Sequence, residues 1–342
     1  MTYLQKRAKA ATLRDIAQSV GVSVSTVSRY INSSGYVDRE TAEKIADSIT
    51  LMHYEPSLVA QSLKSQKSST ILLVVPDICN PFYSTIAKTT QRLVSEKGYA
   101  LVLYDSEESM HELPAVKLAR QMYASGVLLG SIDIKPDTIG ELIRANMPVV
   151  ALNAYQQYPF DTVHVQGSNG SYIATQHLIE LGHKRIGFAG GTPDSMIGKS
   201  RREGFERAMA EAQLIPRRED IIERGFAQSD GVDMGIYFAS MENRPTAICC
   251  ANDLVAMGLL SAIHERKIVV PEDISIVGMD DIPYASVSSP SLTSVTNDGA
   301  RFAQEGVRML FERIEGAYAG TPRSVSIDHQ LIVRSSTARH KT

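Results

Sequence analysis

The sequence predicts an α/β protein with a small all-helical head and a large body of two lobes, each built around a parallel sheet. Two observations support this fold class. Up to Pro56, apolar residues recur at helical spacing, and from Thr70 onward short apolar runs alternate with helical stretches. The chain of 342 residues is long enough for two to three domains, since one domain usually takes about 100–200 residues.

The head begins with two helices joined by a tight turn. Thr12 and Asp15 form a capping box that starts the first helix, Gly21 can take the positive φ of the turn, and Ser23 can cap the second helix. Apolar residues face inward at Ile16, Ala17, Val20, Val27 and at Tyr30 or Ile31. This layout is a helix-turn-helix. An ordinary helical hairpin is the alternative, but it would not require the small residues at positions 17 and 21.

The second helix keeps an outer face of small and polar residues: Val24, Ser25, Thr26, Ser28, Arg29 and Asn32. Short side chains let a helix approach base edges and phosphates in the DNA major groove. We expect Val24 and Ser25 to contact bases, and Thr26, Ser28 and Arg29 to contact phosphates or fix the pose of the helix. Thr12 and Arg14 are further DNA-binding candidates.

The charge distribution agrees with a head that binds a polyanion. Up to Lys67 the chain has nine basic and six acidic residues, whereas the remainder has 26 basic and 32 acidic residues. A solvated basic terminus is the alternative explanation.

A third helix is expected from about Asp38 to Met52, and Pro56 disfavours helix at the residue before it. Residues 57–69 follow as a hinge and linker. The stretch from Ser57 to Lys64 can form a helix but is shorter than the roughly 12 residues an isolated helix needs, so we expect it to fold on a partner.

The body shows the repeated strand–helix–strand pattern twice. Continuous apolar runs are typical of parallel strands that are buried on both faces. The first set of expected strands is ILLVVP, YALVLY, GVLLG and MPVVALN, and the second is RIGFAGG, DIIERGF, TAICCAN and ISIVGMD. Ligands of such sheets bind outside the carboxyl ends of the strands, so two facing lobes predict a cleft there.

Seven segments in register resemble one family. TLRDIAQSVGVSVSTVSRYIN, YEPSLVAQSLKSQKS and ILLVVPDICNPFY, followed by LGHKRIGFAGG, RREGF, TAICCANDLVAMGLL and ISIVGMDD, closely resemble the lactose/galactose-repressor family of bacterial transcription regulators. The resemblance spans nearly the whole chain and also includes PSLTSV.

The resemblance implies a helix-turn-helix DNA-binding domain at 1–56 and a bilobed, periplasmic-binding-protein-like effector domain at 70–342. The chain would cross between lobes near Gln166, Val295 and Ile327, giving an N-lobe of about 70–166 and 296–327 and a C-lobe of about 167–295 and 328–342. The family pairs as a homodimer on double-stranded, pseudo-palindromic operator DNA. Its hinge contacts map to Ser57, Ala60 and Leu63, with Leu63 as the apolar wedge and Ser57 where the family usually has Asn.

In the family the cleft binds a small effector, usually a sugar, nucleoside or purine. By resemblance, Arg201 is the effector-binding arginine and Asp280 the acid that accepts from hydroxyls. The other candidates are two amides, three aromatic residues and one hydroxyl: Asn153, Asn252, Phe82, Tyr83, Phe226 and Ser131. Ser131 is included because Gly130 has no side chain where some members of the family carry a polar one.

Each cleft candidate has a structural alternative. Asn80, Asn153 and Asn252 can serve as helix caps, Phe82 and Phe226 as core residues, and Arg201, which lies near Lys199 and Arg202, as part of a solvated face. Asp280 and Asp281 could form an acid/base or metal pair, but no third ligand has helpful spacing.

Several function classes are disfavoured. GxxxxGK[ST] and GxSxG elements are absent, GFAGG lacks dinucleotide-loop spacing, and three cysteines without metal-ligand spacing predict buried free thiols. We therefore expect no cofactor, no metal and no enzyme activity. The rivals are a soluble sugar-binding transport component and an enzyme acting on a sugar or nucleoside.

No secretory signal or membrane span is indicated, so we expect a cytoplasmic protein. The last strand is followed by no heptad repeat, so a tetramerising coiled coil is not expected. A protein corepressor remains compatible with the acidic body.

Overall fold

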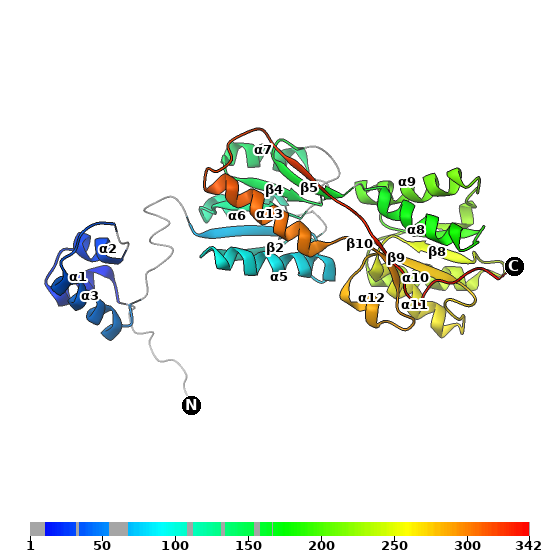
Figure 1. The fold of residues 1–342 in the computed structure, drawn as a ribbon, viewed down its shortest axis with the longest axis horizontal. Helices are drawn as coiled ribbons and strands as arrows, with labels where there is room; N and C mark the ends of the chain where they lie inside the picture. Colours follow the sequence, from blue (N-terminus) through cyan, green and yellow to red (C-terminus); the bar gives the residue numbers. More distant parts are fainter. Residues whose placement is uncertain are drawn as a thin grey trace, which may run out of the picture. The chain divides into compact units, whose positions relative to one another are not determined.

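The computed structural model describes residues 11–31, 34–54, 68–107, 112–130, 134–153, 158–165 and 167–341. The chain divides into two compact units, Met1–Ser68 and Ser69–Thr342. We call the first unit the head and the second the body, and Figure 1 traces both. Asn32, Ser57, Ala60, Leu63, Ser131 and Gln166, which were named above as candidates, lie outside the described residues.

The head contains helices α1 (Leu13–Val20), α2 (Val24–Ile31) and α3 (Arg39–Leu51). The predicted capping box is confirmed: the Thr12 amide donates to the Asp15 carboxylate at 2.8 Å, and the Asp15 amide donates to Thr12 Oγ1 at 3.3 Å. Gly21 ends α1 with a φ of 74°, and Ser23 Oγ accepts from the Thr26 amide at 3.1 Å. The three helices share a small core of Ile16, Ala17, Val27 and Ile45.

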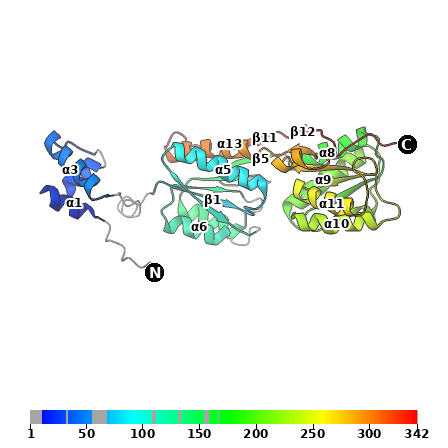
Figure 2. The ribbon, with the colours of Figure 1, turned by 90° about the horizontal axis from the view of Figure 1, so that it is seen from below.

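The first sheet of the body has six parallel strands in the order β11-β5-β4-β3-β1-β2. Its strands are β1 (Thr70–Val75), β2 (Ala100–Asp105), β3 (Gly126–Leu129), β4 (Val149–Leu152), β5 (Asp161–Val165) and β11 (Ser324–Ile327). Helices α5 (Pro81–Glu96) and α13 (Gly299–Ile314) cover one face, and α6 (Glu112–Gln121) and α7 (Pro136–Ala145) cover the other (Figure 2).

The second sheet has the order β12-β10-β9-β8-β6-β7, and among its described strands β12 is antiparallel to its neighbour. Its strands are β6 (Ile186–Gly190), β7 (Ile221–Glu223), β8 (Ala247–Cys250), β9 (Ser275–Asp280), β10 (Thr293–Thr296) and β12 (Leu331–Ile332). Helices α8 (Asn169–Glu180) and α9 (Met196–Glu211) pack on one face, and α10 (Gln228–Ser240) and α11 (Asp253–Glu265) pack on the other. The short helix α12 (Pro283–Val287) follows β9.

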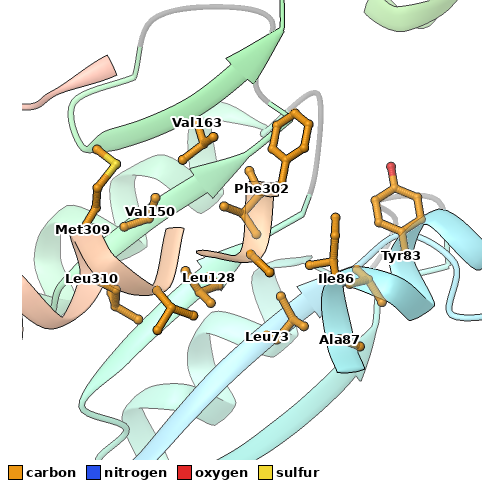
Figure 3. Close-up of a cluster of buried hydrophobic side chains, with 14 of the residues drawn as sticks. Leu73, Tyr83, Ile86, Ala87, Leu128, Val150, Val163, Phe302, Met309 and Leu310 are labelled. Carbon is orange, nitrogen blue, oxygen red and sulfur yellow. The ribbon is translucent and has the colours of Figure 1, made fainter. Parts of the chain in front are cut away.

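The core of the first lobe shows why its strands read as continuous apolar runs. Leu73, Leu128, Val150 and Val163 point from four parallel strands toward Ile86 of α5 and toward Phe302, Met309 and Leu310 of α13 (Figure 3). All eight are fully buried. Full burial of each side chain stabilises the fold by about 1.5–3 kcal/mol relative to leaving it exposed. Because neighbouring strands are parallel, their carboxyl ends meet at one edge of each sheet.

The apolar runs did not predict every element. β5, α8, α13 and the strands β10 and β11 lie outside them, and charged residues interrupt the buried residues of α13 and leave it without a long apolar run. The last strand expected from the sequence, at LIVRSS, is confirmed as β12. The run YALVLY forms β2 as predicted, but it is an edge strand, and Leu103 is 41% exposed.

The prediction of three buried thiols was wrong for one cysteine. Cys249 and Cys250 are buried in β8, where burial raises the pKa of Cys249 to about 12. Cys79 is exposed, because it lies in the turn after β1 with its amide donating to Asp77 Oδ1 at 2.8 Å.

Candidate functional site

A cavity of about 300 Å³ lies in the body at the carboxyl ends of strands from both sheets. Eight residues were predicted for the cleft, and one of them, Ser131, lies outside the described residues. The other seven line the cavity: Phe82, Tyr83, Asn153, Arg201, Phe226, Asn252 and Asp280. Asn153 follows β4 of the first sheet, whereas Asn252 follows β8 and Asp280 ends β9 of the second sheet. The topology therefore brings residues that are far apart in sequence to one site.

Arg201 is the most deeply placed cation of the described cavity wall. It lies on α9, is 3% exposed, and donates through Nη1 to the Ala251 carbonyl oxygen at 2.5 Å. Its Nη2 lies 3.4 Å from Asp280 Oδ1, and its guanidinium lies 5.6 Å from the centre of the Phe226 ring. The solvated-face alternative for Arg201 is therefore wrong.

The neighbouring Arg202 takes the solvated position. Its side chain is 28% exposed and pairs with Glu206 on the same helix and with Glu223 at the end of β7. One residue along a helix turns the side chain by about 100°, so two consecutive arginines face different environments.

Asp280 is a buried carboxylate with two partners. Its Oδ1 accepts from Arg201 Nη2 and from Asn297 Nδ2, both at 3.4 Å. Burial raises the pKa of Asp280, while Arg201 and Asn297 act in the opposite direction. Its backbone φ is 103°, a conformation that costs a residue with a Cβ about 1–3 kcal/mol and that is found mainly where the surrounding structure imposes it.

The three asparagines divide between the two interpretations. Asn80 and Asn252 cap helices: Asn80 Oδ1 accepts from the Phe82 amide at 3.0 Å, and Asn252 Oδ1 accepts from the Val255 amide at 2.8 Å. Asn153 has a φ of 58°, is 1% exposed, and its Oδ1 has no hydrogen-bond partner among the described residues. Of the three, Asn153 is the amide left available to a ligand.

The aromatic residues also differ in their freedom. Phe82 packs edge-on against Tyr83 and Phe302 and belongs to the core, although its edge reaches the cavity. The Tyr83 hydroxyl points away from the labelled aliphatic side chains in Figure 3. Phe226 is half-buried, lines the cavity and lies beside the Arg201 guanidinium.

Sequence reasoning missed part of the cavity wall. Asn80, named above for its capping role, also lines the cavity. The lining residues that were not named are Pro76, Asp77, Lys135, Thr192, Ser195, Met196, Ile197, Ala227 and Asn297. Several of these follow strands or precede helices, which is the signal that could have identified them. Asn297 follows β10, is buried, and leaves its Oδ1 without a partner among the described residues.

The head presents the predicted DNA-binding residues on its surface. Thr12, Arg14, Val24, Ser25 and Arg29 are exposed, and Val24 is 41% exposed although it is apolar. Thr26 and Ser28 are half-buried. Ser23 Oγ lies 2.7 Å from Ser25 Oγ and 2.8 Å from Thr26 Oγ1, so these hydroxyls gather at the first turn of α2.

Two further kinds of feature are absent from the described residues. Across the described ranges, no cluster of three or more His, Cys, Asp or Glu side chains is arranged to hold a metal ion. In the same part of the chain, no helix has the length and apolar character to span a membrane.

Comparisons with known proteins agree with this arrangement. Residues 12–57 match the family described as bacterial regulatory proteins, lacI family, and residues 175–337 match a periplasmic binding protein-like domain. The HTH-type transcriptional repressor PurR of Haemophilus influenzae (strain PittEE) is 32% identical over 330 residues, 95% of this chain and 98% of the relative. PurR of Photobacterium profundum is 31% identical over 329 residues, with the same coverage of 95% and 98%.

Solved structures are similar over nearly the whole chain. The lac repressor dimer bound to operator and the anti-inducer ONPF has a TM-score of 0.84 at 26% identity, covering 96% of this chain and all of that one. A complex of the transcriptional regulator CelR with cellobiose has a TM-score of 0.72 at 27% identity, covering 95% and 99%.

A helix-turn-helix head joined to a two-lobed body, with a cavity whose wall includes buried polar side chains, defines a class of protein, the ligand-responsive regulators of transcription. The chain belongs to the lacI family of bacterial regulatory proteins, as the resemblance predicted. It is a DNA-binding regulator of transcription with a small-molecule effector, and it is not an enzyme.

Proposed function

We propose that the protein is a cytoplasmic, homodimeric repressor whose affinity for a pseudo-palindromic operator is set by a sugar or sugar derivative bound in the cavity between its lobes. The functional units of this proposal are a DNA-binding domain at 1–56, a hinge at 57–69 and an effector and dimerisation domain at 70–342. The relatives named PurR are repressors, and the lac repressor dimer was solved on its operator.

The observation that carries the effector proposal is the set of buried polar groups around the cavity. Arg201 Nε, Asn153 Oδ1 and Asn297 Oδ1 are buried and have no partner among the described residues. A buried polar group without a hydrogen bond costs about 1–3 kcal/mol of stability. A ligand that supplies the missing partners removes this cost, which favours the complex.

The mixture of groups favours a hydroxyl-rich ligand. A sugar hydroxyl both donates and accepts, so neighbouring hydroxyls can serve the Arg201 donor, the Asn153 acceptor and the Asp280 carboxylate together. Phe226 supplies an aromatic face for the apolar side of a sugar ring. The cavity volume of about 300 Å³ suits a ligand of one or two rings.

A thermal-shift screen tests the effector class. The panel contains free sugars, sugar acids and sugar phosphates, with nucleobases and nucleosides as the second arm. A true effector at 100 times its Kd adds about 2.7 kcal/mol to the free energy of unfolding. We expect a shift with a member of the sugar arm. A shift confined to the nucleobase arm would replace the sugar proposal with a purine-type effector.

For the head, we propose that Val24 and Ser25 read base edges and that Arg29 contacts phosphate. Val24 is exposed at the start of α2, where recognition helices contact bases, and Arg29 is exposed in its last turn. Thr12, Arg14, Thr26 and Ser28 would support the pose or contact phosphates. Asn32, Ser57, Ala60 and Leu63 stay predictions for the end of the helix and the hinge.

The base-reading proposal is tested by selecting operators from a random library. Exchanging Val24 and Ser25 together changes the selected sequence, whereas Arg29→Ala weakens binding to all sequences and lowers the salt slope by about one. An unaltered selected site would contradict the assignment of Val24 and Ser25. In the same assay, Leu63→Ala lowers affinity for the operator and leaves binding to random DNA unchanged.

A further inference from the structure

Asp253 is a buried carboxyl group beside the cavity that does not line it. It is the first residue of α11, directly after the cavity residue Asn252, and it is fully buried. Its Oδ2 accepts from the Ile282 amide at 2.8 Å, and its Oδ1 accepts from Ser294 Oγ at 2.7 Å. The carboxyl group therefore connects α11 to the turn after β9 and to strand β10.

The turn after β9 needs such support. Asp280 and Asp281 have φ values of 103° and 49°, in the left-handed region that disfavours side chains with a Cβ. The Asp281 amide donates to Ser294 Oγ at 3.1 Å, and Ser294 Oγ donates in turn to Asp253. Both backbone amides that follow Asp280 are therefore held by Asp253, one directly and one through Ser294.

A glycine in β9 makes room for this carboxyl group. A Cβ at Gly278 would lie 2.2 Å from Asp253 Oδ1, so a larger residue there would displace Asp253 or the strand. The same strand ends at Asp280, two residues further on. The approach of Asp253 and the position of Asp280 are thus set by one short segment.

We propose that Asp253 is a positioning residue that holds the turn Asp280–Ile282 and so sets where the Asp280 carboxylate lies in the cavity. The effector part of this inference rests on the proposed function. The network also reaches the segment that leaves the second sheet: Ser294 lies on β10, and Asn297, just after β10, donates to Asp280 Oδ1. A shift of Asp280 is therefore passed to the segment that leads toward α13 and the first lobe.

The charge state of Asp253 suggests a conservative replacement. Burial raises the pKa of Asp253 well above its ordinary value, and the neighbouring Asp280 adds to the effect. An asparagine at 253 has nearly the same shape, accepts from the Ile282 amide through Oδ1, and donates to Ser294 through Nδ2. The Ser294 oxygen still accepts from the Asp281 amide, because a hydroxyl has two acceptor positions.

Hydrogen exchange on the full chain tests the proposal without any ligand. In Asp253→Ala the Ile282 amide loses its acceptor, and the Ser294 hydroxyl that accepts from the Asp281 amide loses the carboxyl group that holds it. Both amides should therefore exchange at least about tenfold faster, while β8 amides keep their protection. Asp253→Asn should exchange within about threefold of wild type. Ser294→Ala should expose the Asp281 amide alone, and it serves if the Asp253→Ala variant does not fold. Unchanged exchange at both amides would overturn the proposal.

A double-mutant cycle tests the consequence for binding. Titrations with D-ribose, D-galactose and cellobiose are made on Asp253→Ala, on Asp280→Asn and on the double variant. Asp280→Asn is chosen because asparagine tolerates a left-handed backbone. For whichever of these sugars wild type binds, we expect the affinity of Asp253→Ala to be at least about tenfold lower than that of wild type. Because Asp253 acts through Asp280, the affinity of the double variant should match that of Asp280→Asn within about twofold.

The outcomes separate the two proposals. Multiplied losses in the double variant, or wild-type affinity in Asp253→Ala, would overturn the positioning role. If wild type binds none of the three sugars and no ligand of the wider panel, the proposed function fails. The exchange measurement still decides whether Asp253 holds the turn.

Discussion

The two lobes share a strand order, and each contains a buried aspartate, but the two aspartates have different partners: positively charged side chains in the first lobe and uncharged groups in the second. Asp161, at the start of β5, accepts from Arg313 Nη2 at 2.7 Å and from Arg323 Nη2 at 2.9 Å. Asp253, at the start of α11, accepts from a hydroxyl and a backbone amide. Both residues are almost fully buried, at 1% and 0% exposure.

Because the partners differ, the pKa values of the two carboxyl groups shift in opposite directions. Burial alone would raise the pKa of Asp161, but the hydrogen bonds and charges of Arg313 and Arg323 together lower it. Burial raises the pKa of Asp253 well above its usual range, and its partners oppose this only in part. Burial alone therefore does not determine what a carboxyl group does. The Asp161 carboxylate pairs with Arg313 of α13 and with Arg323, which precedes β11, whereas Asp253 accepts hydrogen bonds from the turn after β9 and from β10.

The matched substitutions Asp161→Asn and Asp253→Asn give the largest contrast. Asp161→Asn removes the charge that two arginines require, and we expect it to lower the free energy of unfolding at neutral pH by about 3 kcal/mol. Asp253→Asn keeps its hydrogen bonds and removes the cost of burying an ionisable carboxyl group, so it should not lower this free energy. Chemical denaturation followed by circular dichroism measures both. Equal losses would break the comparison.

The contributions of Asp161 and Asp253 to the free energy of unfolding should also depend on pH with opposite signs. The pKa of Asp161 is lowered on folding, so its stabilisation is present above the unfolded value of about 3.9 and is lost as pH falls through the folded value. The pKa of Asp253 is raised, so its contribution is lost as pH rises above about 3.9 through the folded value.

The stability difference between wild type and each variant should follow these signs. Thermal unfolding from neutral to acidic pH should show the advantage of wild type over Asp161→Asn shrinking at low pH. Wild type should lose stability relative to Asp253→Asn as pH rises. Parallel curves for wild type and Asp253→Asn would mean that folding does not raise the pKa of Asp253, which would contradict this account.

Much of the fold could be predicted because burial leaves a local sequence signal. A strand buried on both faces, such as β1 or β8, must be apolar at nearly every position. The start of a capped helix such as α1 can be predicted from its capping residues, here Thr12 and Asp15. Asp161 left no such signal. Its two arginines lie 152 and 162 positions away, so its role depends on the topology that pairs β5 with β11.

The sequence predicted which strand-end residues line the cavity, but it did not predict the contacts and burial of each side chain. Local spacing alone favoured a solvated Arg201, because Lys199 and Arg202 flank it. Its burial arises from contacts with Ala251 and Asp280, which lie on other elements. Asn297 was missed because it lies in a segment between lobes that has no periodic pattern.

The two lobes also bring different chemistry to the cavity, and this offers the most direct test of the effector site. The first lobe supplies the Asn153 amide, whereas the second supplies the Arg201 and Asp280 pair. Arg201→Lys keeps a positive charge beside Asp280 but loses the planar fork of donors. Arg202→Lys is the matched control, because Arg202 pairs with Glu206 and Glu223 outside the cavity wall.

Calorimetric titration of wild type, Arg201→Lys and Arg202→Lys with the sugar that gives the largest thermal shift is the decisive measurement. We expect Arg201→Lys to raise Kd at least about tenfold, because hydroxyls of the bound sugar lose their donors. Arg202→Lys should bind as wild type does. Unchanged affinity in Arg201→Lys, or equal losses in both variants, would contradict an effector site built on Arg201.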